Sequence, residues 1–270
     1  MQIPPNVQRF REESFFVTTS NRPKKELVIR AKELARLLKA PYISRRTLVQ
    51  HQNPPQPDFY YVMETDRLVI RGADGSQLFF HPASAKMRHR NLKNGQEDHL
   101  INVLELRGNE QVLDLTLGLG SEAILMAGYL EQGGFVVGLE ASRHLAVIVG
   151  HGLKTYRDDS PWIQQAMSRV VVEHADYKRK IRELPDDAYD IVYCDPMFES
   201  PVWESSALNA IRPFAIYDSI DLEDVDHMKR VARKKVVLKA LYRDSLFDQI
   251  AVDHLTGSRH SGVLYGVIHP

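Results

Sequence analysis

The feature that most restricts the fold is an alternation of short apolar strands with helices from about residue 95 onwards. Helical patterns cover 96–106, 121–131, 142–154 and 161–167. The strand-like runs are 111–115, 135–140, 169–175, 190–195, 234–240 and 262–268. Apolar strands separated by helices are typical of a parallel sheet covered on both faces, with right-handed crossovers. The sequence therefore predicts a doubly wound, mainly parallel α/β domain of Rossmann-like type over residues 95–270.

Residues 1–94 have a different texture and are predicted to form a small N-terminal α+β domain. A strand is expected at 14–20, and a helix at 24–39 whose apolar residues share one face. Three short apolar runs between residues 58 and 82 predict a small antiparallel meander. We assign this domain a possible role in recognising a substrate such as RNA.

Composition narrows the class of protein. A single cysteine excludes an internal disulfide framework and a multi-cysteine zinc site, and the eleven histidines show no metal-binding spacing, so no metal is predicted. No apolar run approaches the roughly 20 residues of a membrane-spanning helix, and the first residues lack the apolar core of a signal peptide. We expect a soluble, cytoplasmic protein without a membrane partner.

The net charge of zero hides an uneven distribution. Residues 1–110 contain 18 Lys+Arg and 12 Asp+Glu, whereas residues 111–270 contain 17 and 23. Such an asymmetry either indicates an anionic partner for the basic part or is an ordinary imbalance. The basic segment 79–93 could guide a phosphate backbone towards the crevice or form a solvated helix face. The basic segment 229–235 is expected at a helix end, where cations interact favourably with the helix dipole.

A glycine-bearing loop between the first strand and its helix predicts a ligand site. Gly118 and Gly120 allow close backbone approach, and the helix that follows offers free N–H groups. Glu140 ends the next strand, where a carboxylate can accept hydrogen bonds from ribose hydroxyls. Together these features indicate a nucleoside-containing cofactor, either S-adenosyl-L-methionine (SAM) or NAD. Asp114 favours SAM, because a carboxylate repels a pyrophosphate but can pair with the ammonium group of methionine; its alternative role is to brace the loop.

Two further strand ends carry candidate residues. Asp176 could meet an adenine amino group and Tyr177 could pack on its ring, although Asp176 could equally be a helix N-cap. Asp195 ends the 190–195 strand, and Pro196 and Phe198 come after it. A carboxylate, a rigid turn and an aromatic ring suit methylation of an exocyclic amine, with Phe198 stacking on a flipped base. The alternative is a proline turn with a core phenylalanine.

These motifs resemble a known family. Asp-Pro-Met-Phe is similar to the Asp/Asn-Pro-Pro-aromatic signature of amino methyltransferases, with Met197 in place of the second proline. With LDLTLGLGSEA, GLEAS and HADY, it resembles the 16S ribosomal RNA guanine-N2 methyltransferases (small-subunit methyltransferase J) and their Firmicutes relatives over about residues 78–268. The ribosomal enzyme has Arg-Asp where this chain has Ser121-Glu122.

The resemblance implies a seven-stranded methyltransferase sheet, SAM as cofactor and ribosomal RNA, or the small ribosomal subunit, as partner. The candidate catalytic residues are Asp195, Pro196, Phe198 and Lys239, the last of which could touch a substrate phosphate or brace Asp195. The candidate cofactor contacts are Asp114, Thr116, Gly118, Gly120, Ser121, Glu122, Glu140, Ala141, Asp176, Tyr177 and Asp195. Three alternatives stay open at this point: a methyltransferase of DNA, protein or small molecules, an NAD-dependent oxidoreductase, and a non-catalytic RNA-binding module.

Overall fold

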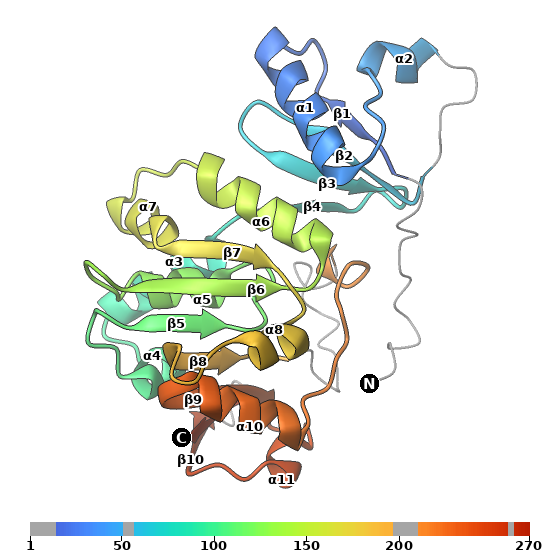
Figure 1. Ribbon diagram of the computed structural model, residues 1–270. Helices are drawn as coiled ribbons and strands as arrows, with labels where there is room; N and C mark the ends of the chain where they lie inside the picture. The colour runs from blue at the N-terminus through green and yellow to red at the C-terminus, as the bar shows by residue number, and fades with distance from the viewer. Residues whose placement is uncertain (1–14, 51–56, 197–209, 259–261) are drawn as a thin grey trace.

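The computed structural model describes residues 15–50, 57–196, 210–258 and 262–270, which form two sheets with helices around them (Figure 1). The described helices include none that is both long and apolar enough to cross a membrane.

The N-terminal sheet has the order β1-β2-β3-β4, with bounds Val17–Thr19, Phe59–Met63, Leu68–Gly72 and Gln77–Phe79. The strands β2 to β4 pair antiparallel, which confirms the predicted meander. The strand β1 joins β2 in parallel, because α1 (Lys25–Leu38) and α2 (Arg45–Gln50) lie between them in the chain. The predicted face of α1 is the buried one, and it consists of Leu27, Ala31, Leu34, Ala35 and Leu38.

The large sheet has seven strands in the order β10-β11-β9-β8-β5-β6-β7. In chain order from β5 to β11, the bounds are Gln111–Asp114, Phe135–Glu140, Val170–His174, Tyr189–Cys194, Ala232–Leu241, His254–Ser258 and Val263–Ile268. Only β11 runs antiparallel to its neighbours β9 and β10. The predicted doubly wound, mainly parallel, seven-stranded sheet is confirmed. The strand β10 had no counterpart among the predicted elements, since its exposed and half-buried residues give no apolar run.

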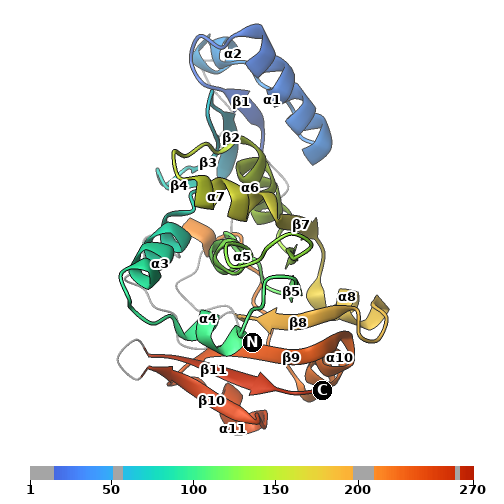
Figure 2. The same cartoon turned by 90° about the vertical axis from the view of Figure 1, so that its left-hand side faces the viewer.

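Helices cover both faces of this sheet (Figure 2). Val112 and Leu113 are adjacent in β5 and belong to two different core clusters, as the two-residue period of a strand requires. The first cluster contains α4 (His99–Leu104), α5 (Ser121–Ala127), α6 (Arg143–Thr155) and α7 (Pro161–Ser168). The second contains α8 (Tyr177–Glu183) and α10 (Leu222–Val231), with the short α11 (Leu246–Gln249) beside it.

The N-terminal unit is fixed to the large domain through α6. The Tyr61 hydroxyl lies 2.6 Å from His144 Nδ1, and both side chains are buried with Phe59. A guanidinium nitrogen of Arg30 lies 3.0 Å from His151 Nε2. On the other side of the junction, α3 (Ala83–Lys93) follows β4 and packs against α5. Both the aromatic contacts and α3 therefore place the N-terminal unit firmly on the large domain.

The strand order creates a crevice at the carboxyl edge of the large sheet. The chain passes outward from β5 to β6 and β7, and then returns to β8 on the other side of β5. The loops that follow β5 and β8 therefore leave in opposite directions. Open α/β sheets bind ligands at such a switch point.

Candidate active site

The glycine loop after β5 adopts a conformation that favours glycine. Gly118 has a φ angle of 54° and Gly120 one of 76°, both in the left-handed region where side chains are disfavoured. Gly120 directly precedes α5, and the Ile124 amide donates to its carbonyl oxygen at 2.9 Å. The chain thus reverses tightly, and Thr116 and Gly118 line a pocket at the switch point.

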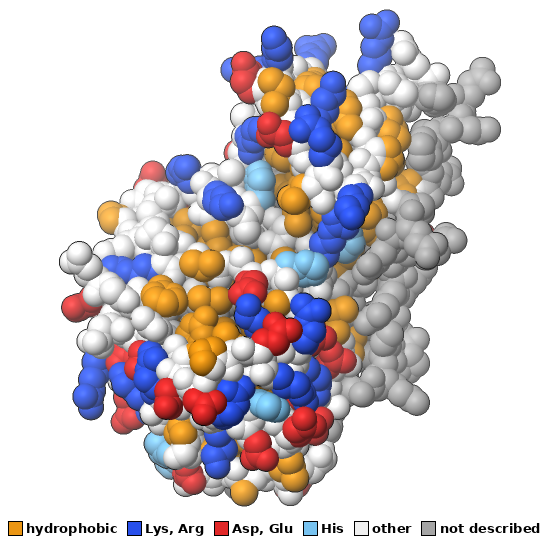
Figure 3. Space-filling model, in the orientation of Figure 1, with side chains coloured by type: hydrophobic (Ala, Val, Ile, Leu, Met, Phe, Trp, Pro, Cys, Tyr) orange, Lys and Arg blue, Asp and Glu red, His pale blue; other side chains and the backbone are white. Residues whose placement is uncertain are grey.

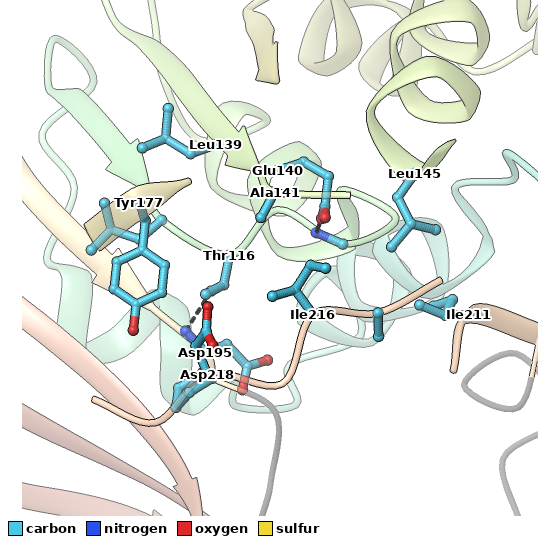
Figure 4. Close-up of a pocket in the computed structure, with 14 residues that line it drawn as sticks. Thr116, Leu139, Glu140, Ala141, Leu145, Tyr177, Asp195, Ile211, Ile216 and Asp218 are labelled. Carbon is cyan, nitrogen blue, oxygen red and sulfur yellow. Dashed lines mark hydrogen bonds between the residues drawn. The ribbon is translucent and has the colours of Figure 1, made fainter. Parts of the chain in front are cut away.

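Glu140 holds this loop from the end of β6. Its Oε2 accepts a hydrogen bond from the Gly118 amide at 2.9 Å (Figure 4), and its Oε1 accepts one from the Ser142 amide at 2.7 Å. The side chain is largely buried, and burial raises the pKa of Glu140 to about 7, against the lowering effect of these two amides. Each carboxylate oxygen keeps a lone pair for a further donor. Glu140 can therefore accept hydroxyl groups of a ligand without releasing the loop.

Asp114 lies behind the pocket wall at the end of β5. The side chain is almost completely buried, and its Oδ1 accepts a hydrogen bond from the Thr116 amide at 3.0 Å. Burial raises the pKa of Asp114 to about 8, and the neighbouring carboxylates Glu122, Asp195 and Glu140 raise it further than burial alone would. The site therefore contains a buried acid that is poised to ionise when a cation arrives.

The shifted pKa of Asp114 predicts a pH-dependent stability. Because the folded-state pKa lies above that of the unfolded chain, its stabilising contribution is complete below about pH 4 and is lost as the pH rises through about 8. Asp114→Asn keeps the acceptor for Thr116 and removes this loss. Without cofactor, we expect the melting temperature of wild type to fall relative to that of the variant as the pH rises from 5 to 8. Parallel melting curves across this range would contradict the assignment, and Asp114→Ala controls for the lost hydrogen bond.

Asp195 directly follows β8, the strand that pairs with β5. Its backbone amide donates to Thr116 Oγ1 at 2.7 Å (Figure 4). Its Oδ2 accepts a hydrogen bond from Lys239 Nζ at 2.6 Å. The other oxygen, Oδ1, is buried and has no hydrogen-bond partner in the part of the chain that the structure describes. Burial raises the pKa of Asp195 to about 6, although Lys239 opposes this. One oxygen is thus fixed, and the other is available to a donor.

A chain of ion pairs extends from Asp195 to the N-terminal side of the domain. Lys239 Nζ also lies 3.4 Å from Glu122 Oε1, and Arg88 from α3 lies 3.2 Å from the same oxygen. Arg88 in turn binds both oxygens of Asp98, at 2.7 and 2.8 Å. Burial opposes the charge of Lys239, but Asp195 and Glu122 outweigh it and raise the pKa of Lys239. The interpretation of Lys239 as a brace for Asp195 therefore agrees with the geometry.

The pocket itself is walled by residues from both sides of the switch point. Its apolar wall includes residues of the segment before α10, which no sequence motif indicated, because isolated apolar residues in a long connection have no periodicity. Figure 4 shows Ile216 and Asp218 of this segment near Thr116 and Asp195. The lining residues are Leu115, Thr116, Gly118, Leu139, Glu140, Ala141, Leu145, Tyr177, Asp195, Pro196, Ile211, Ala215, Ile216 and Asp218.

The predicted site residues divide into three groups. The first group lines the pocket and consists of Thr116, Gly118, Glu140, Ala141, Tyr177, Asp195 and Pro196. The second group supports that lining without belonging to it and consists of Asp114, Gly120, Glu122 and Lys239. The third group neither lines the pocket nor supports its lining. Ser121 is the first residue of α5, and the exposed Asp176 caps α8, where its side chain accepts a hydrogen bond from the Arg179 amide at 3.2 Å. Phe198 lies outside the described residues.

The pocket fits a ligand that combines an apolar ring, hydroxyls and positive charge. The rings and aliphatic chains of Leu139, Tyr177 and Ile216 offer apolar contact, while Glu140 offers acceptors. The buried acid Asp114 and the half-buried acid Asp195 suit a cationic group more than a pyrophosphate. Among the described residues, no group of three or more His, Cys, Asp or Glu side chains is arranged to hold a metal ion.

Comparison with known families agrees with this geometry. A family model described as "Putative SAM-dependent methyltransferase" matches residues 43–258, which is most of the chain. The chain belongs to this family of SAM-dependent methyltransferases. Its cofactor is therefore S-adenosyl-L-methionine, as predicted, and the NAD alternative is set aside. The residues that line the pocket are therefore the candidates for holding this cofactor, and the predicted contact of Glu140 with its ribose stays a prediction.

Two curated relatives and one solved structure are informative. The chain is 32% identical over 252 residues to the uncharacterised protein YpiP of Bacillus subtilis, covering 92% of this chain and 98% of YpiP. It is 29% identical over 193 residues to ribosomal RNA small subunit methyltransferase J of Laribacter hongkongensis, covering 69% and 67%. A crystal structure of a SAM-dependent methyltransferase from Neisseria gonorrhoeae shares the fold, with a TM-score of 0.63, 17% identity and coverage of 95% and 96%. The resemblance predicted from the motifs is confirmed.

Proposed function

We propose that this methyltransferase acts on an exocyclic amine of RNA, with guanine N2 of small-subunit ribosomal RNA as the target. The observation that carries the proposal is oxygen Oδ1 of Asp195 at the cofactor pocket, which is buried and has no hydrogen-bond partner among the described residues. An exocyclic amine presents N–H donors, and a buried carboxylate oxygen without a partner is an acceptor placed for one of them.

The residues of the site would contribute by orientation more than by strong base catalysis. The bound cofactor supplies a methyl group on a positively charged sulfur, which is already activated for transfer. Thr116 and Lys239 fix the Asp195 backbone and Oδ2, so that Oδ1 can accept an amine hydrogen. This hydrogen bond places electron density on the nitrogen as its bond to the methyl carbon forms. Asp195 or water then receives the amine proton.

The RNA assignment has two supports outside the pocket. The relative from Laribacter hongkongensis bears the name of a ribosomal RNA methyltransferase. The N-terminal 110 residues also carry the excess of basic side chains that an anionic substrate needs. In this proposal Phe198 stacks on the target base, and the ribosomal small subunit is the partner. Asp176, the cap of α8, and Ser121, the first residue of α5, stay proposed cofactor contacts.

The proposal is tested with tritiated SAM and total RNA, DNA and protein from a strain that lacks the gene. We expect label in ribosomal RNA only, and mass spectrometry of digested 16S RNA to locate it as N2-methylguanosine. Label confined to protein or DNA would refute the RNA substrate while leaving the methyltransferase assignment intact. Methylated guanosine with the group on another atom would refute the N2 assignment alone.

The Lys239–Asp195 pair predicts a specific pH profile. Methyl transfer needs ionised Asp195, so kcat should fall as the pH drops through about 6. Lys239→Met removes the cation that lowers the pKa of Asp195. We expect this acidic limb to move upward by at least one pH unit, with kcat at pH 9 changed less than at pH 6.5. If the acidic part of the kcat profile of Lys239→Met lay at the same pH as that of wild type, Asp195 ionisation would not control the rate.

A further inference from the structure

The surface of helix α1 carries positive charge that the described chain does not neutralise. Residues 15–50 contain nine Lys and Arg residues but only two acids, Glu26 and Glu33. The described residues give none of these nine cations a carboxylate within salt-bridge distance. Figure 3 shows the Lys and Arg side chains gathered over the N-terminal unit at the top of the molecule. Folding therefore leaves this charge available to a partner.

The second half of α1 concentrates this charge along a shallow groove. Lys32, Arg36 and Lys39 are exposed, and they line the groove together with Tyr42. The Lys32 ammonium lies 5.7 Å from the centre of the Tyr42 ring, which holds the cation at the groove wall. No acidic residue occurs between residues 34 and 50. We refer to Lys32, Arg36, Lys39 and Tyr42 as the α1 cationic surface.

This surface lies at the same edge of the large sheet as the cofactor pocket. The Leu37 carbonyl, in the last turn of α1, accepts a hydrogen bond from the Arg143 guanidinium at 2.6 Å. Arg143 is the first residue of α6, which begins three residues after Glu140. Leu145 in the same turn lines the pocket. Because α6 starts at the carboxyl edge, its contact with Leu37 holds the end of α1 at this edge of the sheet, as the ribbon shows (Figure 1).

We propose that the α1 cationic surface binds the phosphate backbone of the RNA substrate next to the target nucleotide. This inference rests on the RNA substrate proposed above and deepens it. Cations at exposed helix positions contact phosphates without reading base sequence, so they fix the register of the strand on the protein. The rigid contacts of Arg30 and Tyr61 with α6 keep that register constant relative to the pocket.

A second basic groove, on α3, is the natural comparison. It is lined by Lys86, Arg90, Lys93 and the stacked rings of His89 and Trp162, whose centres are 3.7 Å apart. The Trp162 indole donates to the carbonyl oxygen of Gly128, at the far end of α5 from the pocket. The α3 groove therefore lies towards the opposite edge of the sheet. Its Lys86 is also already paired with Asp158 at 2.5 Å.

The two surfaces allow a matched experiment. The variants Arg36→Gln/Lys39→Gln and Arg90→Gln/Lys93→Gln each remove two exposed charges, three residues apart, at the end of a helix. Methylation of in vitro transcribed 16S RNA is measured between 50 and 200 mM salt. We expect the α1 variant to raise KM roughly tenfold at 0.1 M salt and to reduce the salt slope by about 1.5, with kcat unchanged at saturating RNA. The α3 variant should behave as wild type.

The outcomes separate this inference from the function on which it rests. If wild type methylates the RNA and the α1 variant keeps the wild-type KM and salt slope, the surface does not bind the substrate. If the α3 variant alone loses affinity, the RNA follows the other groove, and the inference is equally overturned. If wild type binds SAM but methylates no RNA, the proposed substrate fails instead. Equal melting temperatures of the three proteins confirm that the variants are folded.

Discussion

Replacing Asp195 by Asn should lower kcat for methyl transfer by about 10²- to 10³-fold while the affinity for cofactor stays within a few-fold of wild type. The amide preserves the size of the side chain but presents a neutral group to both Lys239 and the substrate amine. In wild type, Oδ1 is the oxygen without a partner among the described residues. The variant therefore lacks the charged acceptor that we propose for the substrate amine. Label transfer from tritiated SAM to 16S RNA measures kcat, and calorimetry with S-adenosylhomocysteine measures cofactor binding.

Asp218→Asn is the matched control for this experiment, because Asp218 also lines the pocket and belongs to a different segment. We expect it to retain kcat within about threefold. An Asp195→Asn enzyme with near wild-type kcat would refute the role of Asp195 in orienting the amine. A loss of cofactor binding equal to the loss of activity would instead assign Asp195 to the cofactor.

The second large effect is expected at Glu140, whose replacement by Ala should weaken SAM binding by about 100-fold. If Glu140 binds the ribose as predicted, the variant removes the acceptors for its hydroxyls, and each hydrogen bond to a charged group is worth about 1.5–3 kcal/mol. It also frees the amides of Gly118 and Ser142, which Glu140 holds at 2.9 and 2.7 Å. The loop then loses the shape that accepts the cofactor. Calorimetry with SAM at pH 8, above the Glu140 pKa of about 7, makes the wild-type carboxylate fully available.

Glu140→Gln separates the two contributions, because its amide oxygen can replace one carboxylate acceptor. We expect an intermediate loss of about tenfold. The affinity of wild type should also fall as the pH decreases through about 7, since protonation removes an acceptor, whereas the affinity of Glu140→Gln should not follow this change. Identical pH dependence in both proteins would exclude Glu140 from cofactor recognition.

Local pattern was sufficient for the sheet and for the residues at its carboxyl edge. Strand and helix periods are properties of neighbouring residues, so β5 to β9 and the helices α4 to α7 could be predicted, and Glu140 and Asp195 followed from their positions at strand ends. The edge strand β10 lacked that signal because its residues are exposed or half-buried. Asp176 illustrates the same limit, since one sequence position suits both an N-cap and a cofactor contact, and the structure places it as the cap of α8.

By itself the sequence determined the doubly wound sheet, the glycine loop and the family, because all three depend on short-range patterns and motifs. Only the tertiary structure decided what each acid contacts. Glu122 pairs with Arg88 and Lys239, which stand 34 residues before it and 117 after it, and it stays out of the pocket wall. Arg88 belongs to the basic segment 79–93, which was interpreted as phosphate contacts or a solvated helix face. The structure instead pairs it with Glu122, because α3 packs against α5. Burial, which sets the pKa of Asp114, Glu140 and Asp195, likewise arises only when distant segments close over them.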